Sequence, residues 1–185
     1  VQLPVSAGDL MIHAANSGAA LRWPRFGADA VRPGIFLYGG HPAPRVAGVP
    51  APRPVASVRS RLALVREKAS GSTTGYGATY SAPGRERWGT VTIGYGDGIP
   101  RGLGNRGAVL VRGVRTPVIG RVSMDLVTVR LHDVPAARPG DVVTLIGEDG
   151  DERITVDELA SEVDTIGYEI LTGLGSRLTR IERSR

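Results

Sequence analysis

The N-terminal end of the chain has the apolar pattern of a strand, a helix and a second strand. MIHAAN alternates, a helical segment starts near Ser17, and VRPGIFLYG has the continuous apolar character of a buried strand. A strand–helix–strand unit of about thirty residues predicts parallel strand pairing. One such unit is too small to close a parallel sheet, so we expect residues 1–42 to be the end of a larger α/β domain.

Residues 43–57 interrupt this pattern. They are rich in proline and show no periodic apolar positions. Proline disfavours helix at the residue before it and stiffens an extended chain. We therefore expect an extended linker and a domain boundary in this stretch.

From residue 58 to residue 185 short alternating runs predict strands. They include SVRSRLALVREKA, RWGTVTIGYG, GAVLVRGVRTPVIGRVSMDLVTVRL and GDVVTLIG. The pattern indicates a mainly β domain, a barrel or a sandwich with antiparallel pairs. Turn signals separate the runs at Pro83-Gly84, Gly98 with Pro100, Arg112-Gly113, Pro139-Gly140 and Asp149-Gly150.

The C-terminal segment returns to helical spacing. Thr155, with Glu158 three residues later, forms a capping box that predicts a helix over TVDELASEV. TIGYEILTGLGSRL is apolar enough for a second helix and a final strand.

Composition excludes several classes of protein. The chain has 185 residues, 41% of them hydrophobic, and no stretch reaches the roughly 18 apolar residues of a membrane-spanning helix. We expect a soluble, cytoplasmic protein with no membrane partner. The absence of cysteine excludes a disulfide framework and a thiolate zinc site. No metal site is expected, because Asp97 and Asp125 have no histidine at ligand spacing.

The net charge of +5 does not indicate a nucleic-acid partner. All 23 basic residues except Lys68 are arginines, and they are scattered without interleaved aromatic residues. We interpret them as solvated surface groups.

Candidate chemistry in residues 1–42 centres on Ser17 and Arg32. Ser17 stands where the predicted helix begins, and free backbone amides there suit an anion to which its hydroxyl could donate. The same serine could be only a helix cap. Arg32 lies among apolar neighbours and needs a partner, either in a buried salt bridge or in a functional site.

Within the β domain, Tyr76 stands between two glycines in GYGATY. Flanking glycines let the backbone turn sharply and hold the phenol out into a cleft, although a barrel-rim tyrosine with no chemical task would have the same pattern. A phenol acts as a base only where cations or hydrogen bonds lower its pKa from about 10. Further turn residues with polar or reactive side chains follow in IGYGDGIPRG and GRVSMD.

Several segments occur in the order and spacing of bacterial alanine racemases, enzymes that use pyridoxal phosphate (PLP). They are HAANSGAAL, VRPGIFLYGG, TGYGATY, IGYGDGIPRGLGNRGAVLVRG, TPVIGRVSMD and DTIGYEILTGLGSR. The chain resembles the C-terminal half of that family over nearly its whole length. The resemblance implies a mainly β protein, with a C-terminal β-barrel-like domain preceded by a remnant of the (β/α)8 barrel that holds PLP.

The resemblance also implies roles for single residues. Tyr76 resembles the catalytic tyrosine, the base or acid on one face of the α-carbon; the family's second base is the lysine that binds PLP. Arg32 resembles the arginine that faces the PLP pyridine nitrogen and keeps it unprotonated. Ser17, Gly34 and Ile35 resemble phosphate-cup positions, and Ser176 stands where many relatives have a phosphate-binding tyrosine and some a serine.

On the substrate side, Met124 resembles the residue whose backbone amide helps to hold the substrate carboxylate. Tyr95, Arg101 and Arg121 resemble an entry corridor in which cations would steer that carboxylate. The implied substrate is alanine, and the implied product is D-alanine for peptidoglycan precursors of the cell wall.

Family dimers share their active sites between subunits, so the resemblance implies a homodimer. Tyr76, Tyr95 and Met124 would serve the partner's PLP, while Ser17 and Arg32 serve their own. The region that would carry the PLP lysine is absent from this sequence, so we expect the chain not to racemise alanine alone. We interpret it as part of a full racemase; one chain of a split enzyme, or a module that binds PLP or a partner barrel without turnover, are the alternatives.

Overall fold

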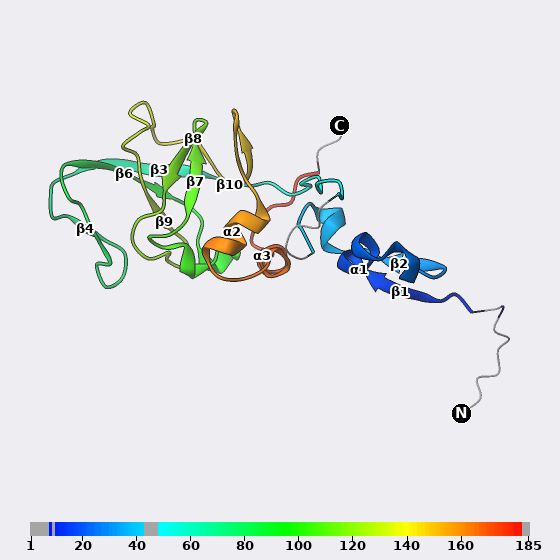
Figure 1. The fold of residues 1–185 in the computed structure, drawn as a ribbon. Coiled ribbons are helices and arrows are strands. Elements are labelled where there is room, and N and C mark those ends of the chain that lie inside the picture. Colours follow the sequence, from blue (N-terminus) through cyan, green and yellow to red (C-terminus); the bar gives the residue numbers. More distant parts are fainter. Residues whose placement is uncertain (1–7, 9, 43–47, 183–185) are drawn as a thin grey trace. The chain divides into compact units, whose positions relative to one another are not determined.

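The computed structural model describes residues 8, 10–42 and 48–182. The chain divides into two compact units, Val1–Val55 and Ala56–Arg185. Figure 1 shows their elements, which in chain order are β1 (His13–Asn16), α1 (Ser17–Arg22), η2 (Pro24–Phe26), β2 (Ala30–Arg32), η3 (Ile35–Tyr38), β3 (Val58–Lys68), β4 (Thr73–Thr74), β5 (Tyr80–Ser81), β6 (Glu86–Val91), η4 (Tyr95–Asp97), η5 (Arg101–Leu103), β7 (Ala108–Val111), β8 (Val114–Pro117), β9 (Val127–Arg130), β10 (Val142–Asp149), β11 (Glu152–Ile154), α2 (Val156–Glu162) and α3 (Gly167–Gly173), with η marking 3-10 helices.

The N-terminal unit contains the predicted parallel strand pair. β1 and β2 run parallel, and α1 lies between them in the chain. α1 is capped by Asn16, whose Oδ1 accepts a hydrogen bond from the Ala19 N–H at 3.0 Å. Ser17, which the sequence indicated as a possible cap, is instead the buried first residue of the helix. Its hydroxyl is therefore available for another contact.

The expectation of a buried strand over VRPGIFLYG is wrong. β2 ends at Arg32, because Pro33 has no N–H with which to continue a ladder. The apolar residues that follow form the 3-10 helix η3, which ends at Gly39 with φ +90°. Val31 and Tyr38 are also 44% and 58% exposed. A short apolar run does not by itself distinguish a strand from a helix.

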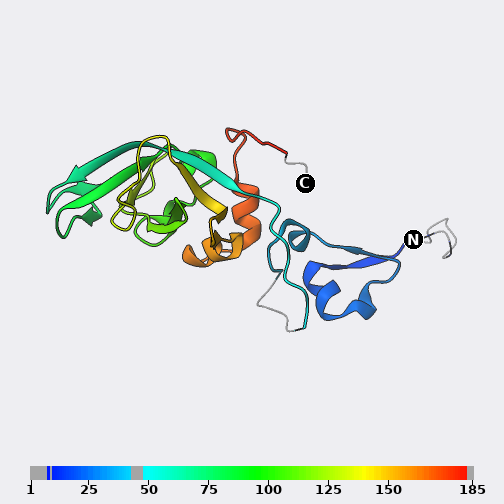
Figure 2. The ribbon, with the colours of Figure 1, turned by 90° about the horizontal axis from the view of Figure 1, so that it is seen from above.

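The second unit is a closed antiparallel sheet. Its seven strands follow the order β8-β7-β10-β3-β6-β9, with β11 paired to β10. A β-bridge between Val118, directly after β8, and Val129 in β9 joins the two ends of this order. The sheet therefore closes on itself as a barrel, so β8 and β9 are not open edges along this order. The predicted mainly β fold with a barrel-like C-terminal domain is confirmed (Figures 1 and 2).

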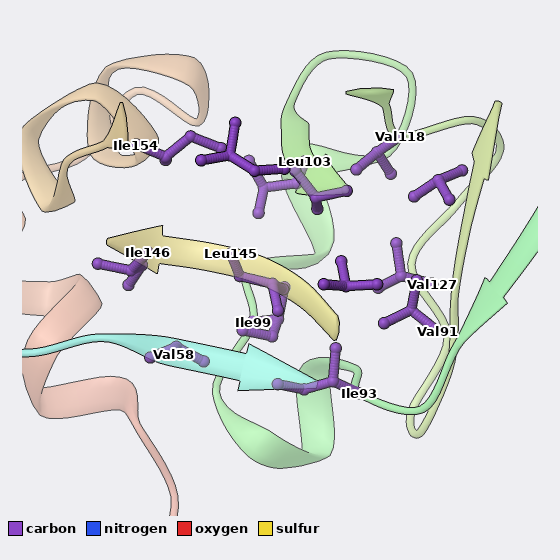
Figure 3. Close-up of a cluster of buried hydrophobic side chains, with 14 of the residues drawn as sticks. Val58, Val91, Ile93, Ile99, Leu103, Val118, Val127, Leu145, Ile146 and Ile154 are labelled. Atoms are coloured by element: carbon purple, nitrogen blue, oxygen red, sulfur yellow. The ribbon is translucent and has the colours of Figure 1, made fainter. Parts of the chain in front are cut away.

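The hydrophobic core lies inside this barrel. Leu62 of β3 and Leu110 of β7 are 1% and 0% exposed. Figure 3 shows side chains from several strands gathered in one cluster, among them Val127 of β9 and Leu145 of β10. Burying a side chain of this size stabilises the fold by roughly 1.5–3 kcal/mol. The unit thus carries a complete core of its own.

Local turn and cap signals were predicted correctly in this unit. Arg112 and Gly113 join β7 to β8 with φ values of 53° and 77°, the positive pair that a type I′ hairpin turn requires. Thr155 Oγ1 accepts a hydrogen bond from the Glu158 N–H at 3.1 Å and starts α2. The Glu158 carboxylate pairs with Arg115, so only the Thr155 half of the predicted capping box is seen. These signals depend on neighbouring residues alone.

The expectation of a final strand after α3 is wrong for the described residues, which end at 182. The chain turns at Gly175, whose N–H donates to the Asp97 carbonyl at 2.9 Å, and the segment joins no sheet. Both views in Figures 1 and 2 place α2 and α3 next to each other. Among the described helices, none is long and apolar enough to cross a bilayer.

Candidate active site

Tyr76 lies in the loop between β4 and β5. Gly75 and Gly77 on either side have φ values of +76° and +75°, in the left-handed region that favours glycine. A Cβ atom at Gly75 would lie 2.6 Å from the backbone nitrogen of Arg121, so this close approach also requires glycine. The resulting turn leaves the Tyr76 side chain 73% exposed. The phenol is therefore held outward, as its flanking glycines predict.

A surface cavity of about 430 Å³ adjoins this phenol. It brings Tyr76 together with Met124, the residue that sequence resemblance links to the substrate carboxylate. Ser123 and Leu126 also line it and were not predicted as site residues. The complete lining is Gly75, Tyr76, Ser123, Met124, Asp125 and Leu126.

The Met124 side of the cavity is held against η4. The Tyr95 N–H donates to the Ser123 carbonyl at 3.0 Å, and the Gly96 N–H donates to the Met124 carbonyl at 2.8 Å. No group in the described part of the chain accepts a hydrogen bond from the Met124 N–H. The backbone of this segment is therefore fixed against η4, and its Met124 N–H is a donor without a described acceptor in a residue that lines the cavity.

Two arginines approach the cavity. Arg121 Nη1 donates to the Tyr76 carbonyl at 3.3 Å. Arg177 pairs with Asp97 at 3.3 Å and with Asp125. The hydrogen bond that Arg177 donates to the Asp125 carboxylate is the main cause that raises the pKa of Arg177. Sequence reasoning missed Arg177, whose only local signal is its place after Ser176. It joins the C-terminal turn to both loops that form the Met124 side.

Four predicted site residues of this unit do not line the cavity: Tyr95, Arg121, Arg101 and Ser176. Arg101 is exposed in η5, and Ser176 is exposed in the turn after α3. Neither lines the cavity. The corridor role of Arg101 and the phosphate role of Ser176 stay predictions.

In the N-terminal unit, the three predicted phosphate-cup residues meet. The Gly34 N–H donates to Ser17 Oγ at 2.7 Å, which leaves the serine proton free to be donated elsewhere. Ile35 is the first residue of η3, so its N–H has no acceptor within that helix. A Cβ atom at Gly34 would meet nothing within 4 Å, so open space adjoins these donors. This donor set suits an anion such as a phosphate.

Arg32 is exposed, so the buried salt bridge considered for it is wrong. Its Nη1 donates to the His13 carbonyl at 3.0 Å and lies 3.1 Å from His13 Nδ1. The partner is therefore the neighbouring strand β1. A guanidinium has five N–H donors, so these bonds leave others available.

Two family models match the chain. The model described as alanine racemase, C-terminal domain, matches residues 55–182, and that described as alanine racemase, N-terminal domain, matches residues 4–42. The alanine racemase of Nostoc sp. is 41% identical over 170 residues, which are 92% of this chain and 44% of that protein. The alanine racemase of Symbiobacterium thermophilum is 45% identical over 91% of this chain and 45% of its own length. The chain thus spans about half the length of the curated relatives it matches.

Solved structures give the same result. The alanine racemase from E. faecalis matches with a TM-score of 0.84 at 38% identity, over 90% of this chain and 44% of that one. The Bacillus anthracis alanine racemase with bound L-Ala-P matches with a TM-score of 0.82 at 37% identity, over 89% and 42%. The Bartonella henselae alanine racemase with covalently bound pyridoxal phosphate matches with a TM-score of 0.79 at 34% identity, over 90% and 45%.

Proposed function

Because the chain belongs to the alanine racemase family, we propose that it is the C-terminal part of an enzyme that interconverts L- and D-alanine with PLP. In this proposal residues 1–42 end the PLP-binding barrel, residues 43–57 are a linker, and residues 58–185 form the C-terminal domain. The observation that carries it is the cavity that both Tyr76 and Met124 line, together with a Met124 N–H that no described group accepts.

The residues of the N-terminal unit fit PLP. The Ser17 hydroxyl and the Ile35 N–H would hold its phosphate. Gly34 orients the serine through its own N–H and leaves open space beside these donors. Arg32 would face the pyridine nitrogen, and its permanently protonated guanidinium would donate to that nitrogen and keep it unprotonated. Bound PLP supplies an electron sink for the α-carbon of the amino acid. Covalently bound pyridoxal phosphate in the Bartonella henselae relative supports this assignment.

Tyr76 would move the proton on one face of the α-carbon. Racemisation removes a proton from one face and returns one to the opposite face, so it needs two groups. The phenol oxygen of Tyr76 would be one of them, and a lysine outside this chain would be the other. Its exposure allows the phenol to reach a substrate held by another surface.

The Met124 N–H would hold the substrate carboxylate at the cavity. An N–H donor without a partner suits a carboxylate oxygen, and a hydrogen bond to a charged group is stronger than one to a neutral group. Arg121 and Arg101, with Tyr95, would form the approach to it, where positive charge raises the local concentration of an anionic substrate.

The enzyme is proposed to act as a homodimer in which Tyr76 completes the partner's site. Met124 and Leu126 at the cavity are 52% and 43% exposed, and exposed apolar groups around a site are typical of a surface that another subunit covers. L-Ala-P and cycloserine, bound by two relatives, support a small amino acid as the substrate. A cytoplasmic supply of D-alanine for peptidoglycan belongs to the same proposal.

The test is racemisation of alanine, with added PLP, by a protein in which this chain follows a barrel that carries the PLP lysine. Tyr76→Phe should lower the rate by about 10²–10⁴-fold, the usual contribution of a general acid or base. Tyr168→Phe, which alters another tyrosine of the same unit, should leave the rate unchanged. Equal rates in both variants would contradict the role of Tyr76. A folded, PLP-binding protein that never racemises alanine would contradict the function and favour a binding module.

A further inference from the structure

We propose that Asn105 is a positioning residue that fixes the turn carrying the Tyr76 phenol; this inference rests on the proposed function of Tyr76. The Asn105 side chain touches both the loop that carries Tyr76 and the segment against which that loop packs. Its Nδ2 donates to the Thr79 carbonyl at 3.0 Å, and its Oδ1 accepts from the Gly120 N–H at 2.6 Å. One amide group thus bridges two backbones that are far apart in sequence.

The residue type suits this position for two independent reasons. Asn105 has φ +60°, a left-handed conformation that asparagine tolerates better than most residues. A side-chain amide also supplies one donor and one acceptor, so it satisfies a carbonyl and an N–H at once. Glycine would keep the conformation without the bridge, and aspartate would keep only the acceptor.

The two contacts fix the loop from both sides. Thr79 directly precedes β5, at the end of the loop that holds Tyr76. Gly120 is buried, so without Asn105 its N–H would lose the acceptor that a buried donor requires. The next residue, Arg121, donates to the Tyr76 carbonyl, and its backbone packs against Gly75. Asn105 therefore locks together the two segments that place the phenol.

The expected consequence is kinetic. A proton-transfer group works only at hydrogen-bond distance from its target, and a displacement of about 1 Å costs on the order of 10²-fold in rate. Releasing Thr79 frees one end of the Tyr76 loop. The proton transfer that uses Tyr76 should slow, while the transfer on the opposite face keeps its rate.

Amide hydrogen exchange in this chain tests the bridge directly. In Asn105→Gly, the Gly120 amide and the Ala78 amide, which donates to the Gly75 carbonyl within the loop, should both exchange faster. In Asn105→Asp, Gly120 should stay protected because a carboxylate still accepts, and only Ala78 should exchange faster. Asp164→Gly, at another left-handed position with φ 63°, should change neither. Unchanged exchange at both amides in Asn105→Gly would overturn the bridge.

Kinetics of the same variants, in the protein joined to the PLP-lysine barrel, test the positioning role. Both Asn105 variants should lower kcat by about tenfold or more. The primary isotope effect for α-deuterated alanine should rise for the enantiomer whose α-hydrogen faces Tyr76 and not for the other. A merely structural loss would reduce the active fraction and leave both isotope effects as in the unmodified enzyme, which would overturn the proposal.

The two proposals fail in distinguishable ways. If Tyr76→Phe leaves racemisation intact, the proposed role of Tyr76 fails, and the positioning role of Asn105 fails with it, although the exchange results still report on the bridge. If Tyr76→Phe abolishes racemisation while both Asn105 variants keep full kcat and unchanged isotope effects, only the positioning role is overturned.

Discussion

The two units of this chain differ in how completely they bury their apolar side chains. In Ala56–Arg185 a closed barrel surrounds residues such as Leu110 and Val111, both 0% exposed. In Val1–Val55 a two-stranded sheet leaves Met11 and Leu37 74% and 59% exposed. A two-stranded sheet cannot form a core from its own residues. A segment that is recognisable in the sequence is therefore not always stable on its own.

The residues of the proposed chemistry are also distributed over these two different units. The group proposed for proton transfer, Tyr76, belongs to the unit with a complete core. The proposed cofactor residues belong to the unit whose described residues form no such core. We therefore expect the precise placement of Tyr76 to survive in isolation, and the placement of Ser17 and Arg32 to require further protein surface.

Expressing the two units as separate fragments should give the largest difference in folding stability. Residues 56–185 alone should unfold cooperatively in urea, with the same midpoint as the 185-residue chain. Residues 1–55 alone should aggregate or show no cooperative transition, because exposed apolar faces and strand edges associate. Circular dichroism and gel filtration check both. A monodisperse, cooperatively folded 1–55 fragment would contradict the comparison.

Two leucines, one from each unit, allow the burial of the two units to be compared with the same substitution. Leu110→Ala should destabilise the barrel by about 2–5 kcal/mol, because it leaves a cavity in a closed core. Leu37→Ala removes the same atoms from an exposed site and should change the free energy of unfolding by less than about 0.5 kcal/mol. Urea unfolding of the 185-residue chain measures both. An equal decrease in the free energy of unfolding for both variants would show that the N-terminal unit shares the cooperative core.

A smaller effect concerns the acid stability of the barrel. The Arg138 N–H, followed by the Arg112 side chain at 3.2 Å, lowers the pKa of Asp141. A lowered pKa means that this carboxylate stabilises the fold fully at pH values above its unfolded pKa of about 3.9. The contribution is lost as the pH falls from there through the lower pKa of the folded state. Asp141→Asn should therefore have a lower free energy of unfolding than the unmodified chain at pH 7. This difference between the two proteins should disappear in acid.

Asp151→Asn, which changes an exposed carboxylate in the β10–β11 turn, is the control for that measurement. Its free energy of unfolding should equal that of the unmodified chain both at pH 7 and in acid. Urea unfolding in neutral and acidic buffer provides both comparisons. If Asp141→Asn stays less stable than the unmodified chain in strong acid, the charge of Asp141 is not the cause of the lost stability.

Features that depend on neighbouring residues were predictable from the sequence. The turn at Arg112 and Gly113, the cap at Thr155 and the outward position of Tyr76 all follow from local residue preferences. The 3-10 helix η3 was misread as a strand because a short apolar run fits both.

Features that depend on contacts between residues far apart in the sequence were not predictable. The bridge between Val118 and Val129 that closes the barrel leaves no local pattern. The same is true of Arg177, whose partners come from other loops, and of Asn105, which reads as an ordinary residue in a glycine-rich turn. Sequence resemblance assigns Tyr76 and Met124 to one site, and both residues line the same cavity.

Mixing two inactive enzymes tests whether Tyr76 serves a PLP site on the partner subunit. One is Tyr76→Phe in a protein with the PLP-lysine barrel; the other has that lysine replaced and keeps Tyr76. In a symmetric dimer with shared sites, each mixed dimer regains one intact site, about half of the unmodified activity. Mixed dimers, isolated by two affinity tags, should therefore racemise alanine. No activity in verified mixed dimers would contradict the claim, because Tyr76 and the lysine would then have to come from one subunit.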